Sequence, residues 1–267
     1  MSSTSKSSAD SLPSYKQPPV DEVVCGLRFE PLLQLKVPHI GLLWGKFRQE
    51  YPVVQHAIPI ATDTTLLVDE TTRVPLPRIW FVSKADNELV QFQLDRLYYN
   101  WRHRGDDYPR YPSIIEKFEK AKRQLDAFTD ELQLGPIRTV ECELTYINHI
   151  PKGQGWESFD DFPKVIRDFT WQKQNYSFLP APANIAWQIR FPLPNGKGWL
   201  NVKLNQAIRK GDTVPGLNIE LAAKGLGEET TAAALRNWFD LAHEWIVRGF
   251  ADLTTKEVQE TIWKRER

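Results

Sequence analysis

The apolar positions of this chain change from strand spacing to helical spacing twice, in the same order. Residues 25–29 and 142–146 both read Cys-x-Leu-x-aromatic and alternate between apolar and polar positions, which is typical of a half-buried strand. Each is followed by apolar residues at helical spacing, over residues 38–52 and 156–169. The shared order predicts two similar units, each of which begins with a strand and a helix.

Antiparallel strands and a long closing helix are predicted to complete each unit. The predicted strands are residues 78–83 and 88–103 in the first half, and residues 184–193, 198–209 and 216–224 in the second half. The first closing helix begins at Pro112 and ends before Gly135-Pro136, and the second begins at about Glu229. Both begin at the same distance from the cysteine of their half, which favours a tandem repeat.

These elements predict an α+β protein with a curved antiparallel sheet that carries its helices on one face. Two copies of the unit would form either one long, saddle-like sheet or two facing sheets around a cleft. The arrangement resembles the TATA-binding-protein-like and helix-grip classes, and a likeness of topology implies no function. A capping box at residues 254–257 predicts a short last helix. The predicted organisation is a serine-rich disordered tail over residues 1–17, a first half over 18–136, a second half over 137–253, and a C-terminal helix and tail over 254–267.

Charge and composition narrow the classes of function. The 34 basic and 34 acidic residues cancel, so no net field steers nucleic acid or an anionic membrane toward the protein. No apolar run approaches the ~20 residues that span a bilayer, so no membrane partner is predicted. The start lacks the apolar core of a secretory signal and the two cysteines are isolated, so we expect a cytoplasmic protein with free thiols.

The sequence shows no recognisable catalytic or metal-binding pattern. The five histidines are scattered singly, and His243-Glu244 lacks the second histidine of a zinc-protease helix. The segment Gly225–Thr230 leads into a helix but lacks the Gly-Lys-Ser/Thr of a P-loop, so a loop and helix start explain it. No Gly-x-Ser-x-Gly elbow occurs, and neither cysteine has a histidine nearby in sequence. We therefore predict no metal and no cofactor, and no catalytic residue can be named.

Residues 91–111, QFQLDRLYYNWRHRGDDYPRY, combine aromatic residues with arginines, and their apolar phase switches at Asp95-Arg96. A β-bulge at the switch would return the apolar face to the core, and bulges are frequent beside functional sites. In a regular strand without a bulge, the polar residues before the switch would instead point to the same face as the apolar residues after it. Aromatic residues with arginines suit a protein interface or base stacking. The structural alternative is a bent strand whose arginines pair with Asp95, Asp106 and Asp107.

Six stretches between about Pro18 and Trp263 carry a resemblance to known proteins: PPVDEVVCGLRFEP, PHIGLLWGKFRQEYP, RIWFVS, LVQFQLDRLYYNWRHRGDDYPRY, TYINHI and HEWIVRGFADLT. In these stretches the chain resembles a sporadically distributed family of uncharacterised prokaryotic proteins of about this length. Its most specific parts are Gln-x-x-x-Asp-Arg-x-x-x-Asn-Trp and Tyr-Pro-Arg-Tyr, and Leu97 and Tyr98 depart from the family pattern. The family implies no activity, and its patchy distribution implies a phage-defence or toxin–antitoxin context. It directs attention to a shared site at Gln91, Asp95, Arg96, Asn100 and Trp101.

Three functions remain open. The first is a non-enzymatic, oligomeric interaction protein that binds a macromolecular partner through its curved sheet, favoured by ten tryptophans and no catalytic set. The second is a small-ligand-binding protein or enzyme with a pocket between helix and sheet, whose converging polar groups would be Gln91, Asp95, Asn148 and His149. The third is nucleic-acid binding by a saddle-like sheet. The candidate binding residues are Gln91, Asp95, Arg96, Asn100, Trp101, Arg102, Arg110, Asn148 and His149.

Overall fold

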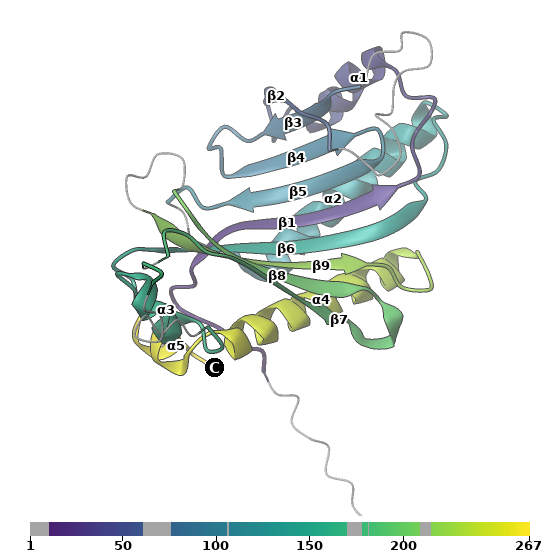
Figure 1. Cartoon of the computed structure of the whole chain (residues 1–267). Helices are drawn as coiled ribbons and strands as arrows, with labels where there is room; N and C mark the ends of the chain where they lie inside the picture. Colours follow the sequence, from purple (N-terminus) through teal and green to yellow (C-terminus); the bar gives the residue numbers. More distant parts are fainter. Residues whose placement is uncertain (1–10, 61–75, 106, 170–177, 181, 209–214) are drawn as a thin grey trace, which may run out of the picture.

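The computed structural model describes residues 11–60, 76–105, 107–169, 178–180, 182–208 and 215–267. In this part of the chain nine antiparallel strands form one sheet in the order β2-β3-β4-β5-β1-β6-β9-β8-β7 (Figure 1). The strands are β1 (Val20–Phe29), β2 (Val53–Ala57), β3 (Arg78–Val82), β4 (Glu88–Gln93), β5 (Arg96–Arg102), β6 (Thr139–Pro151), β7 (Ala186–Pro192), β8 (Trp199–Ala207) and β9 (Gly216–Gly225). The helices are α1 (Val37–Phe47), α2 (Arg110–Glu131), α3 (Phe162–Val165), α4 (Ala232–Leu253) and α5 (Lys256–Thr261). The predicted α+β class with an antiparallel sheet is confirmed.

The two halves of the chain share this one sheet. Its centre is the pair of β1 and β6, in which Cys25 lies opposite Leu144. The other strands of the first half follow β1 on one side, and those of the second half follow β6 on the other side. Of the two arrangements that the sequence leaves open, the single joined sheet is therefore the one observed.

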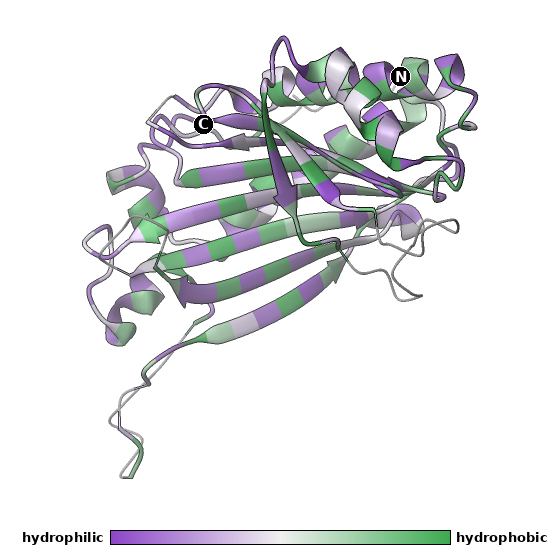
Figure 2. Cartoon of the chain, turned by 90° about the horizontal axis from the view of Figure 1, so that it is seen from above, coloured by the Kyte–Doolittle hydropathy of each residue, from purple (hydrophilic) through white to green (hydrophobic). Residues whose placement is uncertain are grey.

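Alternation along the strands gives the sheet one apolar and one polar face. On β5, Leu97 and Trp101 are buried toward the helices, whereas Arg96 and Asn100 point to the opposite side. Helix α2 packs on β5 and β1, and α4 packs on β6 and β9, so both long helices cover the apolar face. Figure 2 shows hydrophobic and hydrophilic bands alternating along the strands. We call the face opposite the two long helices, which carries Arg96 and Asn100, the open face, and most of its side chains at β4 and β5 are nevertheless buried.

The stretch predicted as one strand over residues 88–103 is a tight hairpin. Strand β4 ends at Gln93, β5 begins at Arg96, and these two residues lie directly opposite each other. The chain reverses over the two residues between them, so the predicted single strand is wrong, and neither alternative for its phase switch, a β-bulge or a regular strand, is observed. The reversal explains the phase switch, because it places Phe92 opposite Leu97 and directly opposed residues point to the same face.

The helix predicted over residues 156–169 is wrong as well. The structure has a 3-10 turn at Phe159–Asp161 and the single turn of α3 in its place. Ile166 takes an extended backbone and forms a β-bridge with Thr254 at the end of α4, which ends the helix. Phe162 and Val165 are nevertheless fully buried. The apolar spacing therefore marked a buried segment but not its secondary structure.

The starts of the last two helices are set by threonine caps. Helix α4 begins after Thr231, whose hydroxyl accepts a hydrogen bond from the backbone N–H of Ala234. Helix α5 begins after Thr255, whose hydroxyl accepts from Val258, one residue later than the predicted cap at Thr254. Both long helices are otherwise close to their predicted ranges.

The N-terminal segment is packed where the structure describes it, and residues 1–10 lie outside the described residues. Tyr15 is buried, with its ring edge-on to Phe250 and Trp263. Its backbone forms a β-bridge with Arg265, so this segment meets the C-terminal residues. The prediction of a disordered tail over residues 1–17 is thus wrong for its last residues, because aromatic packing holds them.

Candidate functional site

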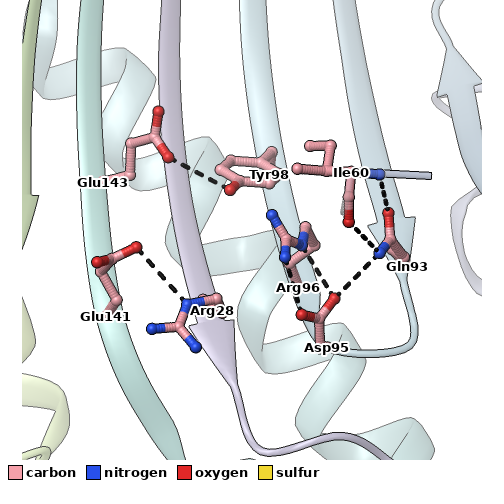
Figure 3. A network of polar contacts seen from close by, with 8 residues as sticks. All are labelled: Arg28, Ile60, Gln93, Asp95, Arg96, Tyr98, Glu141 and Glu143. Atoms are coloured by element: carbon pink, nitrogen blue, oxygen red, sulfur yellow. Dashed lines mark hydrogen bonds and ion pairs between the residues drawn. The ribbon is translucent and has the colours of Figure 1, made fainter. Parts of the chain in front are cut away.

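A network of buried polar side chains lies on the open face at the β4–β5 hairpin (Figure 3). Arg96 donates to Asp95 twice, from Nε to Oδ1 at 2.9 Å and from Nη2 to Oδ2 at 2.8 Å. Gln93 donates to the same carboxylate and also bonds the backbone of Ile60. Burial alone would lower the pKa of Arg96, but the hydrogen bonds and charge of Asp95, helped by Tyr98, raise it instead.

A second chain of hydrogen bonds crosses the open face from β4 to β1. Gln91 Nε2 donates to Asn100 Oδ1 at 2.7 Å, and Asn100 Nδ2 donates to Glu22 Oε1 at 2.5 Å. Burial raises the pKa of Glu22, and the hydrogen bond from Asn100 offsets only part of that rise. Gln91 Oε1 and the indole N–H of Trp80, its cross-strand neighbour, are buried without a hydrogen-bond partner among the described residues.

Arg102 and Arg104 pair with a residue that the sequence reasoning did not name. Both guanidinium groups bind Asp86 in the β3–β4 turn, Arg102 at 2.5 Å and Arg104 at 2.9 Å. Asp106 lies outside the described residues, and Asp107 forms no ion pair with any residue that the structure describes. Of the predicted pairings, the structure shows the one between Arg96 and Asp95.

The structure separates several predicted site residues. Trp101 is buried in the core beneath the helices, and Arg110 begins α2. Asn148 faces the helices, whereas the adjacent His149 lies on the open face, opposite Asn218. The four residues predicted to share one pocket, Gln91, Asp95, Asn148 and His149, are therefore distributed over both faces of the sheet.

A cleft of about 600 Å³ opens on the helix-covered side of the sheet. Its walls come from the segment that precedes β1, the start of α2, strand β6, helix α4 and the last residues of the chain. Apolar side chains such as Val20, Ile246 and Phe250 form much of its surface. We call it the tyrosine cleft, after a polar lining that includes Tyr108, Arg110, Tyr111, Tyr146, Asn148 and His243.

One wall of the tyrosine cleft is a stacked aromatic pair. The rings of Tyr111 on α2 and His243 on α4 lie 4.0 Å apart and are almost parallel, with 10° between their planes. The Tyr111 hydroxyl donates to Asp240 Oδ1 at 2.7 Å, which fixes the orientation of the tyrosine. Burial lowers the pKa of His243 to about 4, and the charge of Asp240 offsets this only in part. The imidazole is therefore neutral at pH 7.

Strand β6 supplies another wall of the cleft. Tyr146 and Asn148 are two positions apart, so both point to the same side of the sheet. The hydroxyls of Tyr146 and Tyr108 share a hydrogen bond of 2.9 Å. Asn148 Nδ2 donates to the backbone carbonyl of Ile219 on β9 at 3.1 Å. These bonds hold the polar groups of the wall in place before any ligand arrives.

Arg110 stands at the mouth of the tyrosine cleft. Its φ is 66°, a left-handed conformation that is uncommon for any residue other than glycine. Its guanidinium donates to the backbone carbonyl of Tyr15 at 2.9 Å, so it connects the start of α2 to the N-terminal segment. Backbone strain of this kind occurs preferentially at functional sites.

Sequence reasoning named Arg110 and Asn148 but missed the other polar residues of the cleft. Tyr108 and Tyr111 stand in the aromatic stretch that drew attention, and the spacing of Tyr146 and Asn148 on one strand was the available signal. His243 was weighed as a zinc ligand, and that role was set aside. Its real neighbour is Tyr111, and that contact depends on how α2 and α4 meet.

Comparisons with models of protein families, with curated proteins and with solved structures found no match. Among the described residues, no group of three or more histidines, cysteines or acids is placed to hold a metal ion. None of the described helices has both the length and the apolar character needed to cross a membrane. The functional argument therefore rests on the geometry of the tyrosine cleft.

Proposed function

We propose that this protein binds a small molecule in the tyrosine cleft. The observation that carries the proposal is the cleft itself, whose volume of about 600 Å³ falls within the ~300–1,000 Å³ of small-molecule sites. An apolar surface with a few polar groups on opposite walls is the usual composition of such a site. Among the described residues, His243 makes no hydrogen bond with a hydroxyl or thiol that it could activate, so we propose binding without turnover.

The walls of the cleft favour binding because they are already ordered. Tyr111 is held by Asp240 and by the stacked ring of His243, and Tyr108 and Tyr146 hold each other. A ligand that enters such a site does not have to immobilise these side chains, which otherwise costs about 0.5–1.5 kcal/mol for each. Because the aromatic walls are already ordered, less of the free energy of a ligand's contacts is lost to immobilising side chains, and the affinity is higher.

Replacing Val247 with tryptophan is expected to abolish ligand binding. Val247 lines the cleft from α4 and is only half-buried, so the larger ring fills the cleft at little cost in stability. The measurement is a melting-temperature screen of neutral and charged metabolites against the wild-type chain and V247W. At a concentration 100 times its Kd, a ligand stabilises the folded state by about 2.7 kcal/mol, which raises Tm by roughly 5 °C for a chain of this size.

The matched control is Asn237→Trp, which adds the same side chain to an exposed position of α4 outside the cleft. Compounds that raise the Tm of the wild type should raise the Tm of N237W equally and should have no effect on V247W. The proposal fails if no compound raises the wild-type Tm, or if the rise persists in V247W.

A second candidate function is partner binding across the open face. It is favoured by the buried polar atoms Gln91 Oε1, Trp80 Nε1 and Arg78 Nε, which have no hydrogen-bond partner among the described residues. Such orphaned groups are costly, and a partner that displaces what covers them would satisfy them. The protein purified from cells that make it naturally should then be part of a complex, and analytical sedimentation should give that complex a fixed stoichiometry. A lone monomer would contradict this function.

The phage-defence context and the cytoplasmic location stay predictions.

We also propose that the two halves are copies of one unit with the arrangement of the TATA-binding-protein-like or helix-grip classes. The strand order supports this proposal. The first strand of each half, β1 or β6, lies at the centre of the sheet, and the other strands of that half follow outward from the last in sequence to the earliest. The halves differ in their second element, which is the helix α1 in the first half and the single turn α3 in the second.

A further inference from the structure

Asn148 offers an uncommitted hydrogen-bond acceptor inside the tyrosine cleft. Its Nδ2 donates to the carbonyl of Ile219, and this bond fixes which way the amide points. The Oδ1 atom consequently remains an acceptor, and it makes no hydrogen bond with any residue in the described part of the chain. Asn148 is 3% exposed and lines the cleft, so a donor for Oδ1 can come from the cleft, where a ligand N–H would take the place of water.

The tyrosine pair offers a donor beside that acceptor. In the hydrogen bond between Tyr108 and Tyr146, one hydroxyl donates to the other and the second keeps its own proton to donate. Burial raises the pKa of both phenols far above the ordinary value, so both are protonated and uncharged near neutral pH. Tyr146 and Asn148 are separated by two positions of one strand, ~7 Å, which a single ring with one polar substituent spans.

His243 completes the polar groups of the cleft. Its ring centroid lies 6.1 Å from that of Tyr146, so it faces the same space. The ring makes no hydrogen bond within the described residues, and a neutral imidazole presents one donor and one acceptor. Together with the stacked ring of Tyr111, it gives an aromatic wall, against which a planar ligand gains from offset stacking or edge contact.

Charged groups are confined to the mouth of the cleft. Those that line it among the described residues are Arg110, Glu266 and Arg267, and all three are exposed. A charged ligand group placed beside Asn148 would lose its hydration without gaining an opposite charge, which is costly. The interior therefore selects against both anions and cations.

We propose that the ligand of the tyrosine cleft carries an uncharged planar ring with a carboxamide or an equivalent donor and acceptor pair. Its N–H donates to Asn148 Oδ1, its carbonyl accepts from the free hydroxyl of the tyrosine pair, and its ring packs against Tyr111 and His243. This inference rests on the proposed small-molecule function and names the class of ligand for that same site.

Three ring compounds of nearly equal size test the inference on the full chain. Benzamide is neutral, benzoate is an anion and benzamidine is a cation, and Kd for each is measured by NMR titration at pH 7. Benzamide should bind in the millimolar range expected for a fragment, and the two ions should bind at least tenfold more weakly. Asn148→Ala should weaken benzamide about tenfold, the loss expected for one hydrogen bond to a buried acceptor.

The outcomes separate the two proposals. Tighter binding of benzoate or benzamidine than of benzamide would overturn the ligand class and leave the cleft as a binding site. The ligand class would also be overturned if none of the three binds, while other compounds raise the Tm of the wild type but not of V247W. If N148A does not fold, the order of affinities on the wild-type chain still decides, because the three probes differ in charge and hardly in shape.

Discussion

Replacing Asp95 with alanine is expected to lower the free energy of unfolding by about 3–5 kcal/mol. The carboxylate of Asp95 is bound by both Arg96 Nε and Arg96 Nη2, and the two residues are 2% and 5% exposed. Removing Asp95 leaves a buried guanidinium without its anion, and that uncompensated charge dominates the loss. Urea denaturation at pH 7, followed by circular dichroism, measures the change.

Two further variants make this result interpretable. Replacing Arg96 with methionine in the D95A background should recover part of the loss, because no buried charge then remains. Glu220→Ala breaks an ion pair with Lys203 on the same face, where both side chains are at least 31% exposed, and should cost less than about 1 kcal/mol. Equal effects of D95A and E220A would contradict the buried character of the hairpin pair.

Acidification from pH 7 to pH 4 is expected to destabilise the wild-type chain through His243 by about 2–3 kcal/mol. Burial lowers the pKa of His243 in the folded state from 6.5 to about 4. Between these values the unfolded chain binds a proton that the folded chain does not, so stability falls as the pH falls. The contribution of this histidine is fully present above pH 6.5 and is lost near pH 4.

The variant His243→Phe isolates this contribution from the other titrating groups. Phenylalanine keeps a flat ring against Tyr111 and has no proton to bind, so the free energy of unfolding of H243F should depend less on pH. The difference between the two chains, measured by urea denaturation at several pH values, should grow between pH 6.5 and pH 4. Parallel curves for both chains would show that His243 is not buried against Tyr111.

The period of the apolar residues predicted the long elements well because each of them buries one face. Helix α2 places Ile114, Phe118 and Leu125 on the sheet, as its 3.6-residue spacing indicates. The β4–β5 hairpin was missed because Leu94-Asp95 carries no glycine or asparagine to signal a turn. The second-half helix was overpredicted because Ile166 leaves the helical conformation and pairs with Thr254, a contact between residues distant in sequence.

The candidate site could be predicted only in fragments. The aromatic stretch contributes to the tyrosine cleft at the start of α2, and Tyr146-x-Asn148 contributes from strand β6. Neither segment alone indicates a cleft. The pairing of Tyr111 with His243 spans helices from different halves of the chain. Local patterns do not encode such a contact, because it depends on how α2 and α4 pack on one sheet.

The most direct test of the account is to locate the bound ligand by NMR on a methyl-labelled chain. The compound that raises the wild-type Tm most is titrated into protein labelled at valine, leucine and isoleucine methyl groups. Binding in the tyrosine cleft predicts that the signals of Val20, Ile246 and Val247 shift together and saturate with one Kd. Saturating shifts at Val82 and Leu89 on the open face, with the cleft methyls unchanged, would contradict it.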